Sequence, residues 1–203
     1  TWSQVGPGMS GYCEEFWCHP TDPNVIMMSP DMFNTYGTWD AGKSWKTIKD
    51  VDGEGKDLAR VRKFMFSYQD PSFGLAITGG GALYKTKDTG RSWGKIHSFR
   101  GRHAEITVDP SNDRNWYVGP GDFWNVKKTW RHQSGQSPKP KKNTGIYRSR
   151  DKGITWELLP VKDFKNLDVG RILVNPNDSK SIIIATNKGV FKSENQGITW
   201  ESS

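Results

Sequence analysis

One octet occurs four times in the 203-residue chain, and it constrains the fold more than any other feature of the sequence. It reads S/T-x-D-x-G-x-S/T-W, and the fourth copy has Asn in place of Asp. Four such octets in one short chain are not a chance event. They predict that the chain repeats one structural unit. The copies are residues 38–45, 86–93, 149–156 and 193–200.

The residue types of the octet predict a tight turn between two strands. An Asp or Asn side chain accepts hydrogen bonds from backbone N–H groups across such a turn. The Gly supplies a positive φ, and the Trp buries a large apolar face. We therefore assign a structural role to the third position of each octet, which is Asp40, Asp88, Asp151 and Asn195.

A second repeated element precedes each octet, and it is an apolar strand that ends in a turn of Pro, Asp and Asn. With the strands that follow, it predicts four strands, A to D, in each repeat, and the octet joins C to D. The third repeat has a long insertion between strands B and C, residues 119–144. The repeats span about 9–48, 60–98, 104–160 and 169–203.

The octet resembles the Asp box, or bacterial neuraminidase repeat, of sialidases, sortilin-type receptors, photosystem II assembly factors and family-74 xyloglucanases. The resemblance implies an all-β fold, a β-propeller of four-stranded antiparallel blades with Asp boxes on the C–D turns. We expect about four blades in residues 1–203, as a single propeller domain or as part of a larger six- to eight-bladed ring. Residues 1–5 read as a strand that closes the last blade. An open ring would need further blades or a partner chain to cover its exposed sheet faces.

Composition narrows the class of protein and of ligand. The chain has 29 Lys and Arg against 22 Asp and Glu, and the net charge of +7 favours a polyanionic partner. Only 33% of residues are hydrophobic, which excludes a membrane-spanning helix, and ten Trp argue against disorder. Cys13 and Cys18 lie on one predicted strand, too far apart to bridge, so we expect two buried free thiols. No motif for a metal or cofactor is present.

Two loops, residues 97–104 and 119–144, are expected to carry the ligand contacts. With strand A innermost, the D–A and B–C loops share one face of a propeller. Cations interleaved with aromatics stack on sugars or on bases, and the Asp-box resemblance favours glycans over nucleic acid. Residues 134–142 also read as a solvated linker. The candidates for substrate binding on these loops are Arg102, His103, Trp124, Lys127, Trp130, Arg131 and His132.

The opening of the chain resembles family-74 glycoside hydrolases. The resemblance lies in Trp2-x-x-Val5-Gly-Pro-Gly, His19-Pro-Thr-Asp-Pro, and Ser29-Pro-Asp31 followed by Tyr36. It implies that Asp31 is the catalytic base of an inverting hydrolysis and that Tyr36 contacts substrate. The family has Gly-Gly where this chain has Phe-Asn, and its partner acid comes from a second propeller. Since glycosidases need two carboxylates, Asp31 as a loop cap or sugar ligand stays open.

Strand A of the first repeat supplies three further candidates. Glu14 and Glu15 lie near the propeller axis, as catalytic acids or as structural acids paired with a nearby cation. Alternation along the strand places one of them toward the channel. Trp17 is a candidate for stacking on a sugar ring. If the two acids are structural, we expect them to pair with Arg60, Arg62 or Lys63.

These observations predict a secreted, glycan-interacting propeller, extracellular or periplasmic, although no leader is visible. The favoured function is that of a glycoside hydrolase-like protein that acts on or binds an anionic polysaccharide. One alternative is a non-catalytic glycan- or protein-binding propeller, similar to sortilins or assembly factors. Another is a polysaccharide lyase, in which Arg and His from residues 102–103 and 131–132 act on a uronate.

Overall fold

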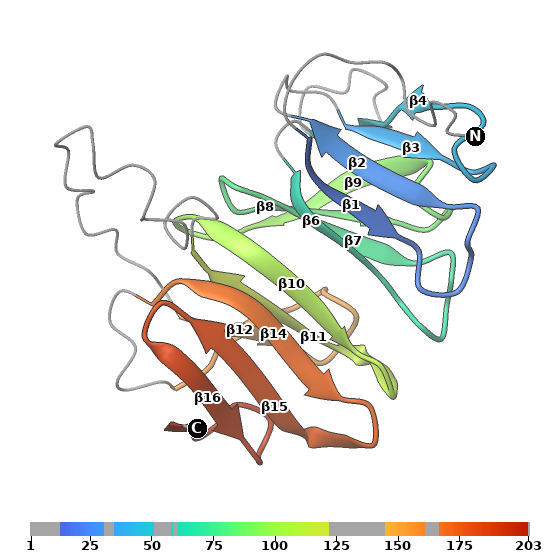
Figure 1. Cartoon of the computed structure of the whole chain (residues 1–203). Coiled ribbons are helices and arrows are strands. Elements are labelled where there is room, and N and C mark those ends of the chain that lie inside the picture. The colour runs from blue at the N-terminus through green and yellow to red at the C-terminus, as the bar shows by residue number, and fades with distance from the viewer. Residues whose placement is uncertain are drawn as a thin grey trace, which may run out of the picture. The chain divides into compact units, whose positions relative to one another are not determined.

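A computed structural model describes residues 13–30, 35–50, 58, 61–121, 145–160 and 167–202. These residues form four sheets, one for each repeat (Figure 1). The first blade contains β1 (Cys13–Cys18), β2 (Ile26–Pro30), β3 (Tyr36–Thr38) and β4 (Lys46–Thr47). The second blade contains β6 (Val61–Phe66), β7 (Gly74–Thr78), β8 (Ala82–Thr86) and β9 (Ser92–Ser98).

The third blade contains β10 (His103–Asp109), β11 (Asn112–Pro120), β12 (Tyr147–Ser149) and β13 (Glu157–Leu158). The fourth contains β14 (Val169–Asn175), β15 (Asp178–Thr186), β16 (Gly189–Ser193) and β17 (Glu201–Ser202). The four strands of each blade pair in chain order and antiparallel, so the predicted all-β architecture is confirmed. One strand departs from it, since β5 (Lys49–Asp50) adds to the second sheet, parallel to β9.

The chain divides into two compact units, each built around two blades. The first unit comprises residues 1–78 and 82–97, and the second comprises residues 79–81 and 98–203. In the first, Trp17 and Met27 of the first blade pack with Phe64 and Phe66 of the second. In the second, Tyr117 of the third blade packs with a run of aliphatic side chains from the fourth. These are Val169, Ile172, Val174, Ile182 and Ile184.

Each strand A ends in a turn that is capped by its own side chain. The imidazole of His19 accepts from the backbone N–H of Asp22 at 3.0 Å, and Ser67 Oγ accepts from that of Asp70 at 3.0 Å. In the second unit, Asp109 and Asn175 accept from the N–H two residues further on, both at 2.9 Å. The four caps therefore align the repeats residue by residue. They make Phe16, Phe64, Ile106 and Ile172 equivalent, and also Trp17, Met65, Thr107 and Leu173.

The Asp box adopts the same hydrogen-bonded turn in all four blades. In the second, Asp88 accepts from Thr86 Oγ1 at 2.7 Å and from the N–H and hydroxyl of Ser92 at 2.9 and 2.6 Å. Burial raises the pKa of Asp88, but these bonds outweigh it and the pKa lies below the ordinary value. In the fourth, Asn195 accepts from Thr199 N and donates to Thr199 Oγ1. The amide thus replaces the carboxylate without loss of the turn.

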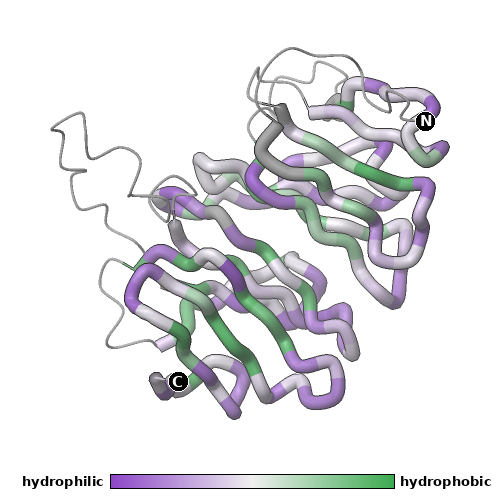
Figure 2. The backbone as a smooth tube through the Cα atoms, in the orientation of Figure 1, coloured by the Kyte–Doolittle hydropathy of each residue, from purple (hydrophilic) through white to green (hydrophobic). Residues whose placement is uncertain are grey.

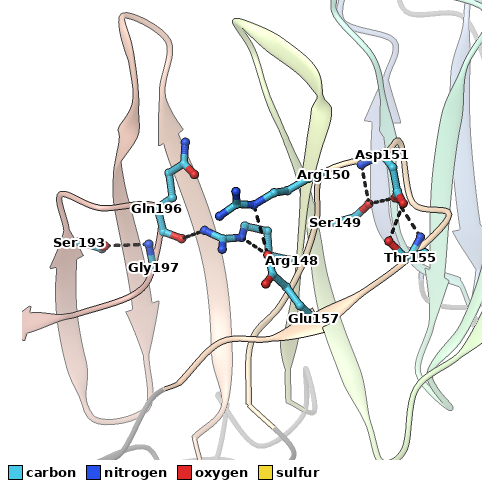
Figure 3. Close-up of polar contacts among 9 residues, drawn as sticks. All are labelled: Arg148, Ser149, Arg150, Asp151, Thr155, Glu157, Ser193, Gln196 and Gly197. Atoms are coloured by element: carbon cyan, nitrogen blue, oxygen red, sulfur yellow. Dashed lines mark hydrogen bonds and ion pairs between the residues drawn. The ribbon is translucent and has the colours of Figure 1, made fainter.

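The residue after each Asp or Asn also has a positive φ, and in the second and fourth blades its carbonyl joins the blade to the one before it. Its N–H donates to a backbone carbonyl in or just after the A–B turn of its own blade, as from Gln196 to Lys180 O at the start of β15, at 3.0 Å. Its carbonyl accepts from the preceding blade within the unit. Arg148 Nη1 donates to Gln196 O at 2.7 Å in the second unit (Figure 3). Trp39 Nε1 donates to Thr89 O at 2.7 Å in the first.

The expectation of two buried free thiols is wrong for Cys18, which is free but exposed. The reason is strand alternation, which turns Cys18 and Phe16 to the face of β1 opposite the buried Trp17. The side chain of Cys13 lies outside the described residues.

Candidate functional site

The D–A and B–C loops of the second unit meet at one end of its sheets, which we call the loop end. At the third blade, Gly121 N donates to Arg102 O at 2.9 Å. At the fourth, Asn187 N donates to Asp168 O at 3.0 Å, and Asp168 N donates to Asn187 Oδ1 at 3.0 Å. The expected meeting of these two kinds of loop is therefore present in both blades.

Exposed cations lie at the loop end. Arg100 and Arg102 on the D–A loop and Lys188 on the B–C loop of the fourth blade are all exposed. Asp168 is 8% exposed and contributes little accessible negative charge. The segment 122–144 leaves this end at Gly121 and returns to it at Gly145. The loop end therefore presents positive charge beside the point where the long B–C loop begins.

An aromatic cluster lies directly beneath the loop end. The ring of Phe99 is 5.0 Å from that of His103, 4.8 Å from Tyr147 and 5.2 Å from Trp156, between ring centroids. Gly81 packs against the backbone of this cluster. The position requires glycine, because its φ is +86° and a Cβ there would lie 2.6 Å from Phe99 O. The cluster fixes the chain from Phe99 to His103, which carries the exposed arginines.

Two predicted ligand contacts have little accessible surface. His103 is 1% exposed, because the side chain enters the aromatic cluster instead of overhanging the face. Trp17 is 7% exposed, with its ring edge-on to Phe64 at 5.2 Å. Their placement indicates packing roles, and no exposed ring supports sugar stacking by either. Tyr36 is half-buried on β3, in register with Met28 and Thr47.

The other predicted site residues stay predictions. The side chains of Glu14 and Glu15 lie outside the described residues, although their backbone belongs to β1. The residues 1–5, expected to close a blade, lie outside them too. The same holds for the remaining candidates for catalysis and substrate binding, which are Asp31, Trp124, Lys127, Trp130, Arg131 and His132.

One charged pair was not anticipated. Glu105, 1% exposed on β10, has a carboxylate oxygen 3.6 Å from Arg171 Nη1 on β14. The pair links the A strands of two adjacent blades. The alignment places Glu15 and Lys63 at the same position in the first two repeats. This alternation of acid and base along the repeats is a sequence signal that would have identified the pair.

Arg148 of the second unit binds residues of two blades (Figure 3). It is 4% exposed, and its Nε donates to Glu157 at 2.8 Å while Nη1 reaches Gln196 O. The bond from Arg148 lowers the pKa of Glu157. Next to Arg148, burial raises the pKa of Tyr117 to about 12. These residues join blades at the Asp-box side and do not form part of the loop end.

Within the described part of the chain, no group of three or more His, Cys, Asp or Glu side chains is arranged to hold a metal ion. The same residues contain no helix that is long and apolar enough to span a membrane.

No family model matches the chain. Among curated proteins, Xyloglucanase Xgh74A of Acetivibrio thermocellus is 27% identical over 160 residues, which are 70% of this chain and 19% of that protein. Vacuolar protein sorting/targeting protein 10 of Sordaria macrospora is 35% identical over 72 residues, which are 36% of this chain and 4% of that protein. The chain thus spans less than a fifth of the length of either curated relative.

Solved structures show the same fold. An ancestral GH74 enzyme matches 100% of this chain with a TM-score of 0.75 and 20% identity, and the chain covers 25% of it. YCF48 bound to D1 peptide matches 99% of this chain with a TM-score of 0.60 and 16% identity, and the chain covers 56% of it. The chain is therefore part of an Asp-box β-propeller. It resembles the propellers of GH74 xyloglucanases, of Vacuolar protein sorting/targeting protein 10 and of YCF48.

Proposed function

We propose that this chain belongs to a glycan-interacting propeller that binds a polysaccharide over its loop end. The observation that carries the proposal is the loop end itself, where exposed Arg100, Arg102 and Lys188 lie at the same end of the sheets as the beginning of an insertion rich in Trp, Lys and Arg. The resemblance to a xyloglucanase over most of the chain supports a polysaccharide as the ligand class. We place the protein outside the cytoplasm as part of this proposal.

The charge of the ligand is a further part of the proposal. Xyloglucan, which the curated relative's name implies as its substrate, is neutral. The net charge of +7 and the cations of the loop end instead favour a uronic or sulfated glycan. This preference rests on charge alone.

Affinity electrophoresis against xyloglucan, a uronic glycan and a sulfated glycan tests the proposal. We expect retardation by at least one of them. The double variant Arg100→Ala/Arg102→Ala should weaken binding to an anionic glycan by at least about threefold, because it removes two nearby charges. Lys87→Ala, an exposed cation of the second Asp box, is the matched control and should leave binding unchanged. Equal indifference to all three glycans would end the proposal.

Catalysis is tested separately from binding. A hydrolase releases new reducing ends, a lyase produces an unsaturated uronate that absorbs in the ultraviolet, and a binding protein does neither. If activity is found, Asp31→Asn should abolish it when Asp31 is the base. Full activity in that variant would remove Asp31 from the mechanism.

A peptide ligand is the second candidate, on two specific observations. The identity to the sorting protein 10 is higher than to the xyloglucanase, although over a shorter segment. The structure of YCF48 holds the D1 peptide on a propeller of the same fold. Selection of peptides from a random library, with Arg100→Ala/Arg102→Ala as the counter-screen, would favour this candidate if the glycans fail.

A further inference from the structure

The A–B turn of the fourth blade carries a short sequence motif that neither the fold nor the loop end accounts for. Asn177-Asp178-Ser179 has the pattern N-x-S/T, and no other Asn of the 203-residue sequence is followed by this pattern. The pattern is the acceptor signal for an N-linked glycan when the middle residue is not Pro. Such a glycan is bulky and needs an acceptor at the surface of the folded protein.

Asn177 lies in a hydrophilic turn between two apolar strands (Figure 2). The turn joins β14 to β15, and the side chain of Asn175 caps it by accepting from the backbone N–H of Asn177 at 2.9 Å. Asn177 itself is exposed. The turn therefore holds Asn177 by its main chain and presents its side chain to solvent.

This exposure recurs in every blade, so it does not arise from the position of the fourth blade in the chain. The alignment of the repeats makes Thr21, Gln69 and Ser111 equivalent to Asn177, and all of them are exposed. Ser111 is the informative case, because the third blade is packed against the fourth and the turn still faces solvent. A glycan at this position of the repeat therefore displaces no packed side chain.

The third residue of the motif is engaged in the folded chain. Ser179 Oγ lies 2.8 Å from Ser111 Oγ, and this contact joins the A–B turns of the third and fourth blades. The acceptor pattern requires a hydroxyl at this position, and in the folded chain that hydroxyl is held in a contact between blades. Transfer of a glycan therefore fits a chain that has not yet folded, and the folded turn then presents the attached sugar.

We propose that Asn177 is an N-glycosylation site. The donor is a lipid-linked oligosaccharide. Nδ2 of Asn177 forms a bond to the anomeric carbon of the first sugar and loses one proton, while the bond from that carbon to the pyrophosphate oxygen breaks and the lipid pyrophosphate leaves. The proposal rests on the placement of the protein outside the cytoplasm, which is part of the proposed function, and it does not depend on polysaccharide binding.

The glycan would lie at the end of the second unit that carries the Asp boxes. Gln196 N of the fourth box donates to Lys180 O, next to the motif, so the box and the A–B turn share this end. The loop end is at the opposite end of the same strands. A glycan on Asn177 therefore leaves the loop end open, and we expect equal polysaccharide binding with and without it.

Mass spectrometry of the whole chain, secreted from a eukaryotic host, tests the proposal. Trypsin cuts after Arg171 and Lys180, and the peptide between them contains Asn175 as well as Asn177. Peptide N-glycosidase should release a glycan from this peptide and convert Asn177 to Asp. Asn175 is followed by Pro and should stay unchanged, so the peptide contains its own control.

Variants of the motif separate the acceptor signal from the turn. Asn177→Gln and Ser179→Ala should each abolish the modification, whereas Ser179→Thr should retain it, because it keeps the hydroxyl. Asn112→Gln, in the A–B turn of the third blade and outside the motif, is the matched control and should leave the modification unchanged. Unfolding of each variant in urea shows that the fold is kept.

The possible failures are distinguishable. An unmodified Asn177, in a host that glycosylates a reference protein under the same conditions, overturns the proposal even if the chain binds a polysaccharide. A glycosylated chain that no polysaccharide retards supports the site and counts against the proposed function. Polysaccharide binding that appears only after peptide N-glycosidase treatment would contradict the placement of the glycan away from the loop end.

Discussion

At the scale of single residues, the Asp box is a local device, because its Asp, Gly and Trp all act within one turn of eight residues. Residue type is therefore sufficient to assign their roles from the sequence. The residue after the Asp or Asn was missed, because Ala41, Thr89, Lys152 and Gln196 share no side-chain chemistry. Their common feature is a positive φ, which the rest of the turn imposes. The burial of His103 could not be predicted from the sequence, since it depends on the rings of Phe99 and Tyr147.

The first box predicts an acid dependence of stability. Hydrogen bonds from Ser44, then from Thr38, lower the pKa of Asp40 from its ordinary value of 3.8 to about 2. The unfolded chain therefore binds the proton first as the pH falls. The stabilisation is fully present above about pH 4 and is lost as the pH falls towards 2. The Asp40→Asn variant should fold, because Asn195 forms the same turn in the fourth box. It should lose less stability over this pH range than the unmodified chain.

Acid-unfolding curves monitored by tryptophan fluorescence measure this difference. The reverse variant Asn195→Asp serves as the matched control, because it restores a carboxylate to the fourth box and should steepen the dependence. Identical pH profiles for Asp40→Asn and the unmodified chain would show that the box carboxylate is not the titrating group.

At the scale of strands and blades, prediction succeeded where pairing is between neighbours in sequence. The order A-B-C-D and the position of the box between C and D follow from alternating apolar residues and turn signals. Strand β5 was not anticipated, since two residues carry no periodic pattern. The contacts between blades were also missed. They join residues such as Arg148 and Gln196, which are far apart in the chain and have no spacing that marks them.

The Arg148 contact predicts how much one such link stabilises the second unit. Arg148→Met removes donors to Glu157 and to Gln196 O, and it leaves the carbonyl near the buried face without a partner. We expect a loss of about 2 kcal/mol in the free energy of unfolding. Arg150 also reaches Glu157, at 3.3 Å, but it is 56% exposed. Arg150→Met should therefore cost less than about 1 kcal/mol.

Urea unfolding followed by tryptophan fluorescence compares the two variants. Both remove one cation that pairs with the same carboxylate, so charge alone predicts equal effects. Equal losses would show that the bond to the Gln196 carbonyl contributes nothing. If Arg148→Lys retains most of the free energy of unfolding that Arg148→Met loses, the effect belongs to the charge and not to the two-pronged guanidinium.

At the scale of the whole chain, the repeat predicted the class of fold but not the arrangement of side chains at the loop end. Hydrogen bonds confirm that the D–A and B–C loops meet. This meeting could be predicted, because strand order alone determines which loops share one end of a sheet. The charge that favoured a polyanion is distributed over many residues, and only Arg100, Arg102 and Lys188 lie at the loop end among those described. The contribution of charge to ligand choice is therefore a question for measurement on the intact chain.

Salt dependence of glycan binding answers that question. The Debye length shortens from about 10 Å at 0.1 M salt to about 3 Å at 1 M, so attraction between exposed cations and a polyanion is screened over this range. Affinity for a uronic or sulfated glycan should fall by at least about tenfold. Affinity for neutral xyloglucan should change little, since stacking and apolar contacts are not screened. An anionic glycan that binds equally at both salt concentrations would show that the loop end recognises sugar shape and not charge.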